Sequence, residues 1–366
     1  MEATWFAIVS AMLAGYAVLD GFDFGVGILH RIVAKTADER KTILAAIGPV
    51  WDGNEVWLIA AGGLLFMAFP KVYATGFSGF YMALMILLWL LILRGIAIEF
   101  RSHQENPLWR EFWDTVFSLA SLACALIFGV ALGNLIRGVP IDEKGLRGMP
   151  LFTNFRTDRH LGLIDWYTGL VGVFALVSLA GHGALYLAWR TTGPVRDRCL
   201  ALARDVWMAA MILWVVVTAA TAWIRPEVFY GFLKRPWTLA FVVLAIAGAV
   251  GAFRFPKRGR ELAAFLSSSV FIFGMVATAM AGNYPYWLRS TIDPEAFSLT
   301  AANSMSARYG MSVALGWWSV GFILVLGYFA YLFSAIRGKV VAGDGPYSSD
   351  AGPADANPVP PSRQGT

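Results

Sequence analysis

The sequence predicts an all-α, polytopic integral membrane protein, with about nine transmembrane helices packed in bundles. The 366 residues are 58% hydrophobic and only 14% charged, with a mean hydropathy of +0.60. Soluble globular domains carry about 25% charged residues. The apolar residues also gather in runs of the length that crosses a ~30 Å hydrocarbon core, which takes ~20 helical residues.

Nine apolar runs can be placed along the chain, near residues 4–29, 54–69, 76–98, 113–136, 163–189, 205–224, 236–253, 261–281 and 309–336. The first is a retained span, because it continues far past the length of a signal peptide. The second is short and ends at Pro70, so we expect the segment before it to lie in the interface or against other helices. Residues 1–338 form the transmembrane domain, whereas the Gly-, Ser- and Pro-rich residues 339–366 are predicted to be a disordered cytoplasmic tail.

The distribution of Lys and Arg predicts the orientation in the membrane. Loops after the first, third, fifth and seventh runs, with the C-terminal tail, hold 17 of these residues, and the opposite side holds 11. Cytoplasmic loops carry the excess of positive charge. We therefore expect a periplasmic N-terminus and a cytoplasmic C-terminus. The net charge of +5 follows from the same rule, so it indicates no nucleic-acid partner.

Cysteine and histidine usage limits the chemistry of the chain. Cys124 and Cys199 form no CxxC pair, so we expect free buried thiols. The histidines number four, no two are four residues apart, and only His182 lies clearly inside a predicted span. A centre with two haems or two metals needs several axial ligands, which these positions do not supply. For His182, a hydrogen-bonded bundle histidine is favoured over a ligand.

Two carboxylates, Asp20 and Asp23, fall within the first run or at its cytoplasmic end. A charged group inside the bilayer costs at least ~2.5 kcal/mol, so both should face protein or water. A structural role and a role as proton relay or ion ligand are equally compatible with the pattern. Gly21 and Gly25 have the spacing that lets two helices approach closely.

The stretch from Gly48 to Trp57 places two acids and an amide directly before an apolar run. Pro49 can open a helix, which would put Asp52 and Glu55 in or near the first turn, where the helix dipole favours negative charge. These two acids are three residues apart and therefore share a helix face.

Arg94 is the only basic residue deep inside a predicted span, and it needs an acidic or carbonyl partner. Glu99 shares a face with Ser102 and His103, near the cytoplasmic end of the same run. Several acids and an arginine thus converge on one side of the membrane. This arrangement suits a proton route, although spacing alone slightly favours a network that only ties helices together. For Asp114, at the start of the fourth run, capping or dipole compensation is favoured.

Four segments closely resemble subunit II of the cytochrome bd-type quinol oxidases. They read Leu-Asp-Gly-Phe-Asp-Phe-Gly-Val-Gly (19–27), Gly-Pro-Val-Trp-Asp-Gly-Asn-Glu-Val-Trp-Leu (48–58), Phe-Pro-Lys-Val-Tyr-Ala…Phe-Ser-Gly-Phe-Tyr (69–81) and Arg-Gly-Ile-Ala-Ile-Glu-Phe-Arg (94–101). The motifs cover the first 140 residues or so, and the number of spans fits the remainder. The last motif resembles the cyanide-insensitive branch of the family.

This resemblance implies a haem-free partner of subunit I, which carries the quinol-oxidising loop, two haems b and usually one haem d. It implies that Asp52 lies at the cytoplasmic start of a proton path to the oxygen-reducing haem, with Ser102 further along and Glu99 nearby. Asp23 and Asp114, like Asp20, stay open as structural or cation-binding carboxylates. The resemblance also implies a bacterial inner membrane, and leaves open a structural quinone, the third haem of the partner and small single-helix accessory subunits.

The function expected from this resemblance is the reduction of O2 to water by quinol, with subunit II stabilising subunit I and supplying the proton path. The isolated chain is expected to have no activity. The main alternative is a proton- or ion-coupled transporter that uses the same acids, although no broken helices recur in two halves of the sequence. A purely structural membrane scaffold is a third interpretation.

Overall fold

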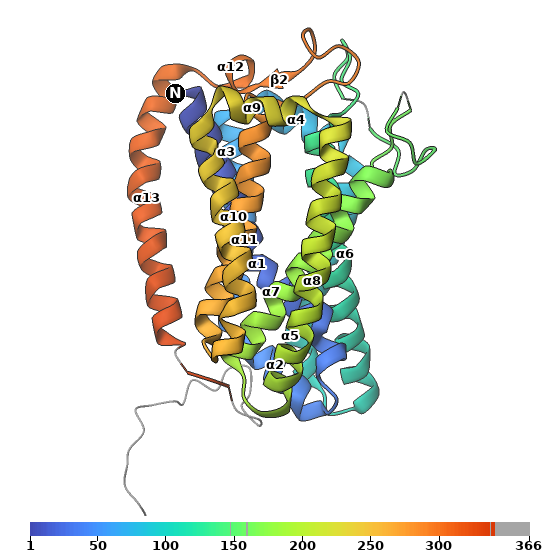
Figure 1. The fold of residues 1–366 in the computed structure, drawn as a ribbon, viewed down its shortest axis with the longest axis vertical. Coiled ribbons are helices and arrows are strands. Elements are labelled where there is room, and N and C mark those ends of the chain that lie inside the picture. Colours follow the sequence, from blue (N-terminus) through green and yellow to red (C-terminus); the bar gives the residue numbers. More distant parts are fainter. Residues whose placement is uncertain (147, 159, 337, 341–366) are drawn as a thin grey trace, which may run out of the picture.

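The computed structural model describes residues 1–340 except 147, 159 and 337, and in this part of the chain nearly every regular element is a helix (Figure 1). The predicted all-α polytopic class is confirmed, because eight helices are long and apolar enough to cross a membrane. Residues 341–366 of the predicted disordered tail lie outside the described residues.

The elements follow one another as long helices joined by short helices and loops. They are α1 (Glu2–Val33), α2 (Ala37–Ile47), α3 (Trp51–Ala68), α4 (Pro70–Gly79), α5 (Tyr81–Phe100), the 3-10 turn η1 (Arg101–His103), α6 (Pro107–Arg137), α7 (Trp166–Arg190), α8 (Gly193–Ile224), α9 (Glu227–Lys234), η2 (Pro236–Thr238), α10 (Leu239–Arg254), η3 (Pro256–Arg258), α11 (Glu261–Asn283), the antiparallel strands β1 (Tyr286–Leu288) and β2 (Leu299–Thr300), α12 (Ala301–Ser304) and α13 (Arg308–Ala335).

Helix α3 also crosses the bundle, so together with the eight apolar helices it makes the nine crossings that the sequence predicted. It is not among the eight apolar helices, because polar residues fill its first turns. However, the N-terminus of α1 and the end of α13 lie at opposite ends of the bundle (Figure 1), which requires an odd number of crossings. With 18 residues, α3 is about 27 Å long, close to the thickness of the hydrocarbon core.

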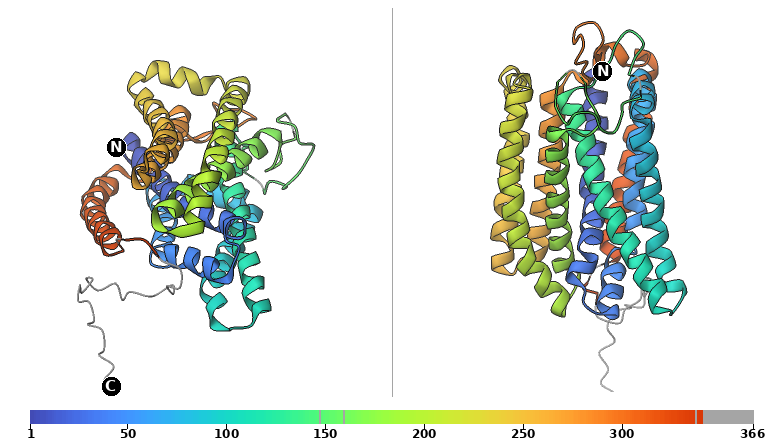
Figure 2. Two further views of the ribbon diagram at one scale, coloured as in Figure 1. Left: turned by 60° about the horizontal axis from the view of Figure 1, so that its bottom comes forward. Right: turned by 90° about the vertical axis from the view of Figure 1, so that its right-hand side faces the viewer.

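The two ends of the bundle carry different short elements and loops. We call the end that carries α2 the α2 end; it also holds the start of α6, the α7–α8 connection and η3 (Figures 1 and 2). All the loops that the positive-inside rule assigns to the cytoplasm therefore meet at one end. The opposite end carries α4, α9, α12 and the two strands.

Helix α1 lies at the centre and packs against α3, α6, α7 and α11. Its closest approach is to α7, where a Cβ added at Gly25 would lie 2.0 Å from the carbonyl oxygen of Leu179 and 2.7 Å from the amide nitrogen of Gly183. Glycine is therefore needed at this crossing, and the packing role predicted for Gly25 is confirmed. In contrast, α13 stands at the edge of the bundle with almost no buried residues.

Candidate functional site

Five polar side chains from α1, α3 and α5 meet inside the bundle, and we call them the interior cluster: Asp20, Asp23, Asn54, Glu55 and Arg94. All are fully buried except Glu55, whose side chain is 27% exposed. Nη2 of Arg94 donates to Oδ1 of Asp20 at 2.5 Å and lies 3.1 Å from Oε1 of Glu55. Nδ2 of Asn54 donates to Oδ2 of Asp23 at 2.8 Å. The prediction that Arg94 needs an acidic partner is confirmed.

The cluster keeps hydrogen-bonding capacity after its own contacts are made. Oδ2 of Asp20, Oδ1 of Asp23, Oδ1 of Asn54 and both Nε and Nη1 of Arg94 have no hydrogen-bond partner among the described residues. The guanidinium carbon of Arg94 lies 4.4 Å from the centre of the Phe24 ring. Buried polar atoms are normally hydrogen-bonded, and in polar sites water often supplies the bond. The cluster is therefore a polar site inside the bundle whose hydrogen-bonding capacity is not used up by its own side chains.

Asp52 links this cluster to the α2 end. It lies in the first turn of α3, as predicted, and it is exposed, although the helix begins at Trp51 after a turn rather than at Pro49. Glu55 follows three residues later on the same face, where side chains are about 5–6 Å apart at Cβ, and it contacts Arg94. Asp52, Glu55 and Arg94 thus form a series that leads from the surface into the bundle.

Glu99 and Ser102 lie at the end of α5, also on the α2 side. The hydroxyl of Ser102 donates to the backbone carbonyl of Glu99 at 3.2 Å, and Nδ1 of His103 lies 3.0 Å from the same oxygen. Ser102 and His103 lie in η1, and both contacts reach the backbone of Glu99, where they close the end of α5; a shared face of the three side chains stays a prediction. Ser102 also lines a pocket of about 320 Å³, together with Lys41, Arg101 and other residues of α2 and α6.

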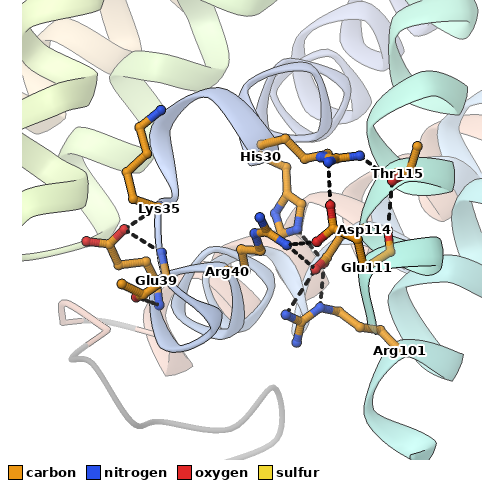
Figure 3. Close-up of polar contacts among 10 residues, drawn as sticks. His30, Lys35, Glu39, Arg40, Arg101, Glu111, Asp114 and Thr115 are labelled. Atoms are coloured by element: carbon orange, nitrogen blue, oxygen red, sulfur yellow. Dashed lines mark hydrogen bonds and ion pairs between the residues drawn. The ribbon is translucent and has the colours of Figure 1, made fainter. Parts of the chain in front are cut away.

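A second group of charged side chains, which we call the α2-end cluster, surrounds Asp114 (Figure 3): His30, Arg40, Arg101, Glu111 and Asp114. Asp114 is only 1% exposed. It accepts hydrogen bonds from Nε of Arg101 and, at 3.2 Å, from Nη1 of Arg40, and its Oδ1 lies 2.6 Å from Nε2 of His30.

The expectation that Asp114 caps a helix is wrong. Helix α6 begins at Pro107, and the side chain of Asn106 caps it by accepting a hydrogen bond from the amide of Leu108. Asp114 therefore lies two turns inside the helix, where it joins α6 to α1, α2 and η1. The first two turns of α6 contain polar and aromatic residues, which include Arg110 and Glu111. The apolar run that predicts this helix therefore begins only near residue 113.

Asp23 and Asp114, which the sequence left open as cation ligands, belong to different clusters. Asp23 is bound by the amide of Asn54, and Asp114 is surrounded by three basic side chains. Throughout the described residues, no group of three or more His, Cys, Asp or Glu side chains is arranged to hold a metal ion. The positive charge beside Asp114 therefore comes from the basic side chains of the protein itself.

Sequence reasoning missed the partners of these acids. The sequence indicates only that Asn54 is an amide near two carboxylates, and it assigns neither His30 nor Arg101 to a site. One signal was available on α1, because His30 follows Asp23 by seven residues, two helical turns, and so lies on the same face. No local pattern connects His30 with Asp114, which is 84 residues away.

His182 is a hydrogen-bonded bundle histidine, as predicted. It is fully buried; its Nε2 lies 3.0 Å from the carbonyl oxygen of Val18, and its Nδ1 lies 2.7 Å from Oγ of Ser268. A carbonyl can only accept, so Nε2 carries a proton, and the Ser268 hydroxyl that contacts Nδ1 also lies 2.7 Å from the carbonyl oxygen of Phe265. Both cysteines are buried and free, which confirms that prediction as well.

Comparisons with known proteins agree with the sequence motifs and the fold. Residues 1–336 match the family model described as cytochrome bd terminal oxidase subunit II. The chain is 33% identical over 363 residues to a probable cytochrome oxidase subunit 2 of Haemophilus influenzae, covering 92% of this chain and 94% of the relative. It is 30% identical over 373 residues to cytochrome bd-I ubiquinol oxidase subunit 2 of Escherichia coli K12, covering 93% and 95%.

A third relative, cytochrome bd ubiquinol oxidase subunit 2 of Bacillus subtilis, is 31% identical over 312 residues, covering 84% of this chain and 88% of the relative. The fold is similar to a chain of the bd oxidase from Geobacillus thermodenitrificans, with a TM-score of 0.69 at 18% identity, covering 91% of this chain and 97% of the other. The chain therefore belongs to the family of cytochrome bd terminal oxidase subunit II, a subunit of an oxidoreductase complex.

Proposed function

We propose that this chain is the haem-free subunit of a quinol:oxygen oxidoreductase of the bacterial inner membrane, and that it stabilises a haem-bearing subunit I and conducts protons from the cytoplasm. The observation that carries the proposal is the series from exposed Asp52 through Glu55 to the buried pair of Arg94 and Asp20. The relatives named as ubiquinol oxidase subunits support the reaction, with quinol and O2 as substrates of the complex.

The chemistry of the histidines supports a partner that holds the haems. Both ring nitrogens of His182 are engaged by the protein, and Nε2 of His30 contacts Asp114. His103 is exposed beside the end of α5 and contacts the carbonyl of Glu99. The buried His182 therefore does not fit a haem site, since an axial imidazole must present a free nitrogen to the iron.

A large apolar face next to Asp52 supports docking of subunit I. On α3, Val56, Ile59 and Phe66 are exposed, and on α5 the exposed residues include Leu88 and Trp89. Lipid could cover such a face, but it continues to the turn where Asp52 is exposed. A partner seated there would place Asp52 at the junction of the two subunits, where a proton can pass toward the oxygen-reducing haem.

In this proposal the position of each residue determines which proton transfer it takes part in. Asp52 takes up a proton at the cytoplasmic surface, Glu55 passes it inward, and Arg94 pairs with Asp20 at the inner end. Ser102, which lines the pocket beside α2, and Glu99, near the end of α5, are proposed as a neighbouring part of the same path. Proton uptake inside and release from quinol outside would generate a membrane potential without a pump.

The test is oxygen uptake with quinol by the purified complex carrying Asp52→Asn. We expect a slower turnover with an unchanged haem absorption spectrum, because the amide cannot exchange the proton. Asp205→Asn is the matched control, since Asp205 is also exposed near the α2 end but is far from this series in the sequence. Unchanged turnover in Asp52→Asn would remove Asp52 from the mechanism.

One absorption spectrum separates this proposal from the transporter interpretation. A subunit of an oxidase co-purifies with haem bands that belong to a second chain, and the bands disappear when that chain is removed. Purified material without haem that moves a substrate across liposome membranes would instead establish a transporter.

A further inference from the structure

A pocket of about 260 Å³ lies between α8 and α10, apart from both polar clusters. Its lining comes from the first half of α8, from the end of α10 and from η3, so it opens at the α2 end. Most of the lining is apolar and includes Trp207, Ala252 and Phe253. Its only charged lining residues are two cations, Arg204 and Lys257, which lie on the two opposite walls.

Among the described residues, no acidic side chain forms an ion pair with either of these two cations. Within the described part of the chain, neither Arg204 nor Lys257 has a carboxylate oxygen within ion-pair distance. The nearby Glu261 is bound to Arg196 and Lys339. Asp205 follows Arg204 directly, and adjacent residues of a helix do not face each other. The pocket is therefore positively charged and apolar at the same time.

An apolar surface continues from the pocket toward the middle of the membrane on both helices. On α8, Met208, Ile212 and Val215 follow Arg204 at helical spacing, and all three are at least half exposed. On α10, exposed Val250, Ile246 and Val243 extend in the same direction from η3. Each stripe begins at the end of the helix that lies beside one of the two cations.

We propose that this pocket binds the headgroup of an anionic phospholipid, with the phosphate between Arg204 and Lys257 and the acyl chains along the apolar stripes of α8 and α10. Basic pockets between transmembrane helices on the cytoplasmic side bind anionic headgroups. The positive-inside rule accounts for basic residues in this loop, but it does not require two of them to line one pocket on either side. Charge complementarity and the adjoining apolar surface together select a lipid as the occupant.

The test is native mass spectrometry of the full complex purified in mild detergent, with phosphatidylglycerol or phosphatidylcholine added. The pocket variant is Arg204→Gln with Lys257→Gln. The matched control is Arg258→Gln with Arg260→Gln, which removes the same amount of charge at and next to η3 but none from the pocket lining. Each basic residue near the surface contributes about 1 kcal/mol to binding of an anionic lipid.

We expect phosphatidylglycerol to bind the pocket variant about 30-fold more weakly than the unaltered complex, a factor that corresponds to about 2 kcal/mol at 1.4 kcal/mol per tenfold. The control variant should bind normally. The proposal would be overturned if both variants retained phosphatidylglycerol equally, or if the unaltered complex bound phosphatidylcholine as well as phosphatidylglycerol. It would also be overturned if inorganic phosphate at the concentration of the lipid displaced the lipid, or if the bound molecule were a quinone.

Discussion

Replacement of Arg94 by methionine tests whether the interior cluster acts as an electrostatic unit. The guanidinium is fully buried, donates to Asp20 at 2.5 Å and lies 3.1 Å from Glu55. Methionine keeps much of the apolar volume that packs over the Phe24 ring. The substitution therefore removes the charge and leaves Asp20 as a buried carboxylate without a basic partner.

The size of the effect follows from this burial. Removal of one partner from a buried ion pair costs about 3–5 kcal/mol, because the other charge stays desolvated and uncompensated. Asp20→Asn should cost less, since Arg94 keeps Glu55, which is 27% exposed and partly solvated. In the double variant neither charge is left alone. We expect its stability to exceed that of Arg94→Met, with a coupling free energy between the two sites of about 3 kcal/mol.

The assay is a double-mutant cycle on the purified complex, unfolded by titration with SDS and followed by tryptophan fluorescence. Arg258→Gln, on the exposed turn η3, controls for loss of one positive charge without loss of a buried pair. Effects of independent sites add to within about 0.3–0.5 kcal/mol. If the losses for Asp20→Asn and Arg94→Met simply add, the two residues do not form a unit and the reasoning fails.

Three further predictions concern helix packing and the α2 end. Gly25→Ala should sharply reduce the yield of folded protein, since the new Cβ would lie 2.0 Å from a carbonyl oxygen of α7, whereas Gly62→Ala, with nothing within 4 Å, should not; equal yields would contradict this. Asp114→Asn should destabilise the complex by about 3 kcal/mol or more in the same SDS titration and Glu111→Gln by under about 1 kcal/mol, because Asp114 is 1% exposed and Glu111 45%; similar losses would argue against a buried network. Hydrogen bonding from Arg198 lowers the pKa of Glu39 from 4.5 to about 2. The ionised Glu39 therefore contributes about 1 kcal/mol to the free energy of unfolding above pH 4.5, and this contribution is lost as the pH falls toward 2. Glu39→Gln should flatten this part of the stability–pH curve, and an unchanged curve would refute the role of the pair.

Helix existence could be predicted from the sequence because the apolar runs are long and few charges interrupt them. Boundaries were less accurate where a helix extends beyond the membrane. Helix α8 begins at Gly193, twelve residues before the predicted span, because Pro194 opens a helix whose first turns carry Arg196 and Arg198. The same polar extension hid the true start of α6.

The candidate site was predicted in part. That Arg94 needs an acid follows from the cost of an unpaired charge in the membrane, and the structure supplies Asp20 and Glu55. Which acid pairs with which base depends on how α1, α3, α5 and α6 are brought together, and side-chain spacing along one helix does not contain that information. The contact between His30 and Asp114 could therefore be identified only from the folded bundle.

The polar start of α3 has a consequence for the way the chain enters the bilayer. Helix α3 is less apolar than the eight other crossing helices, but Asn54 is matched by Asp23 of α1 and Glu55 by Arg94 of α5. The helices before and after it thus bring the groups that make it acceptable to lipid. We therefore expect α3 to be held stably in the bilayer only when α1 and α5 lie beside it.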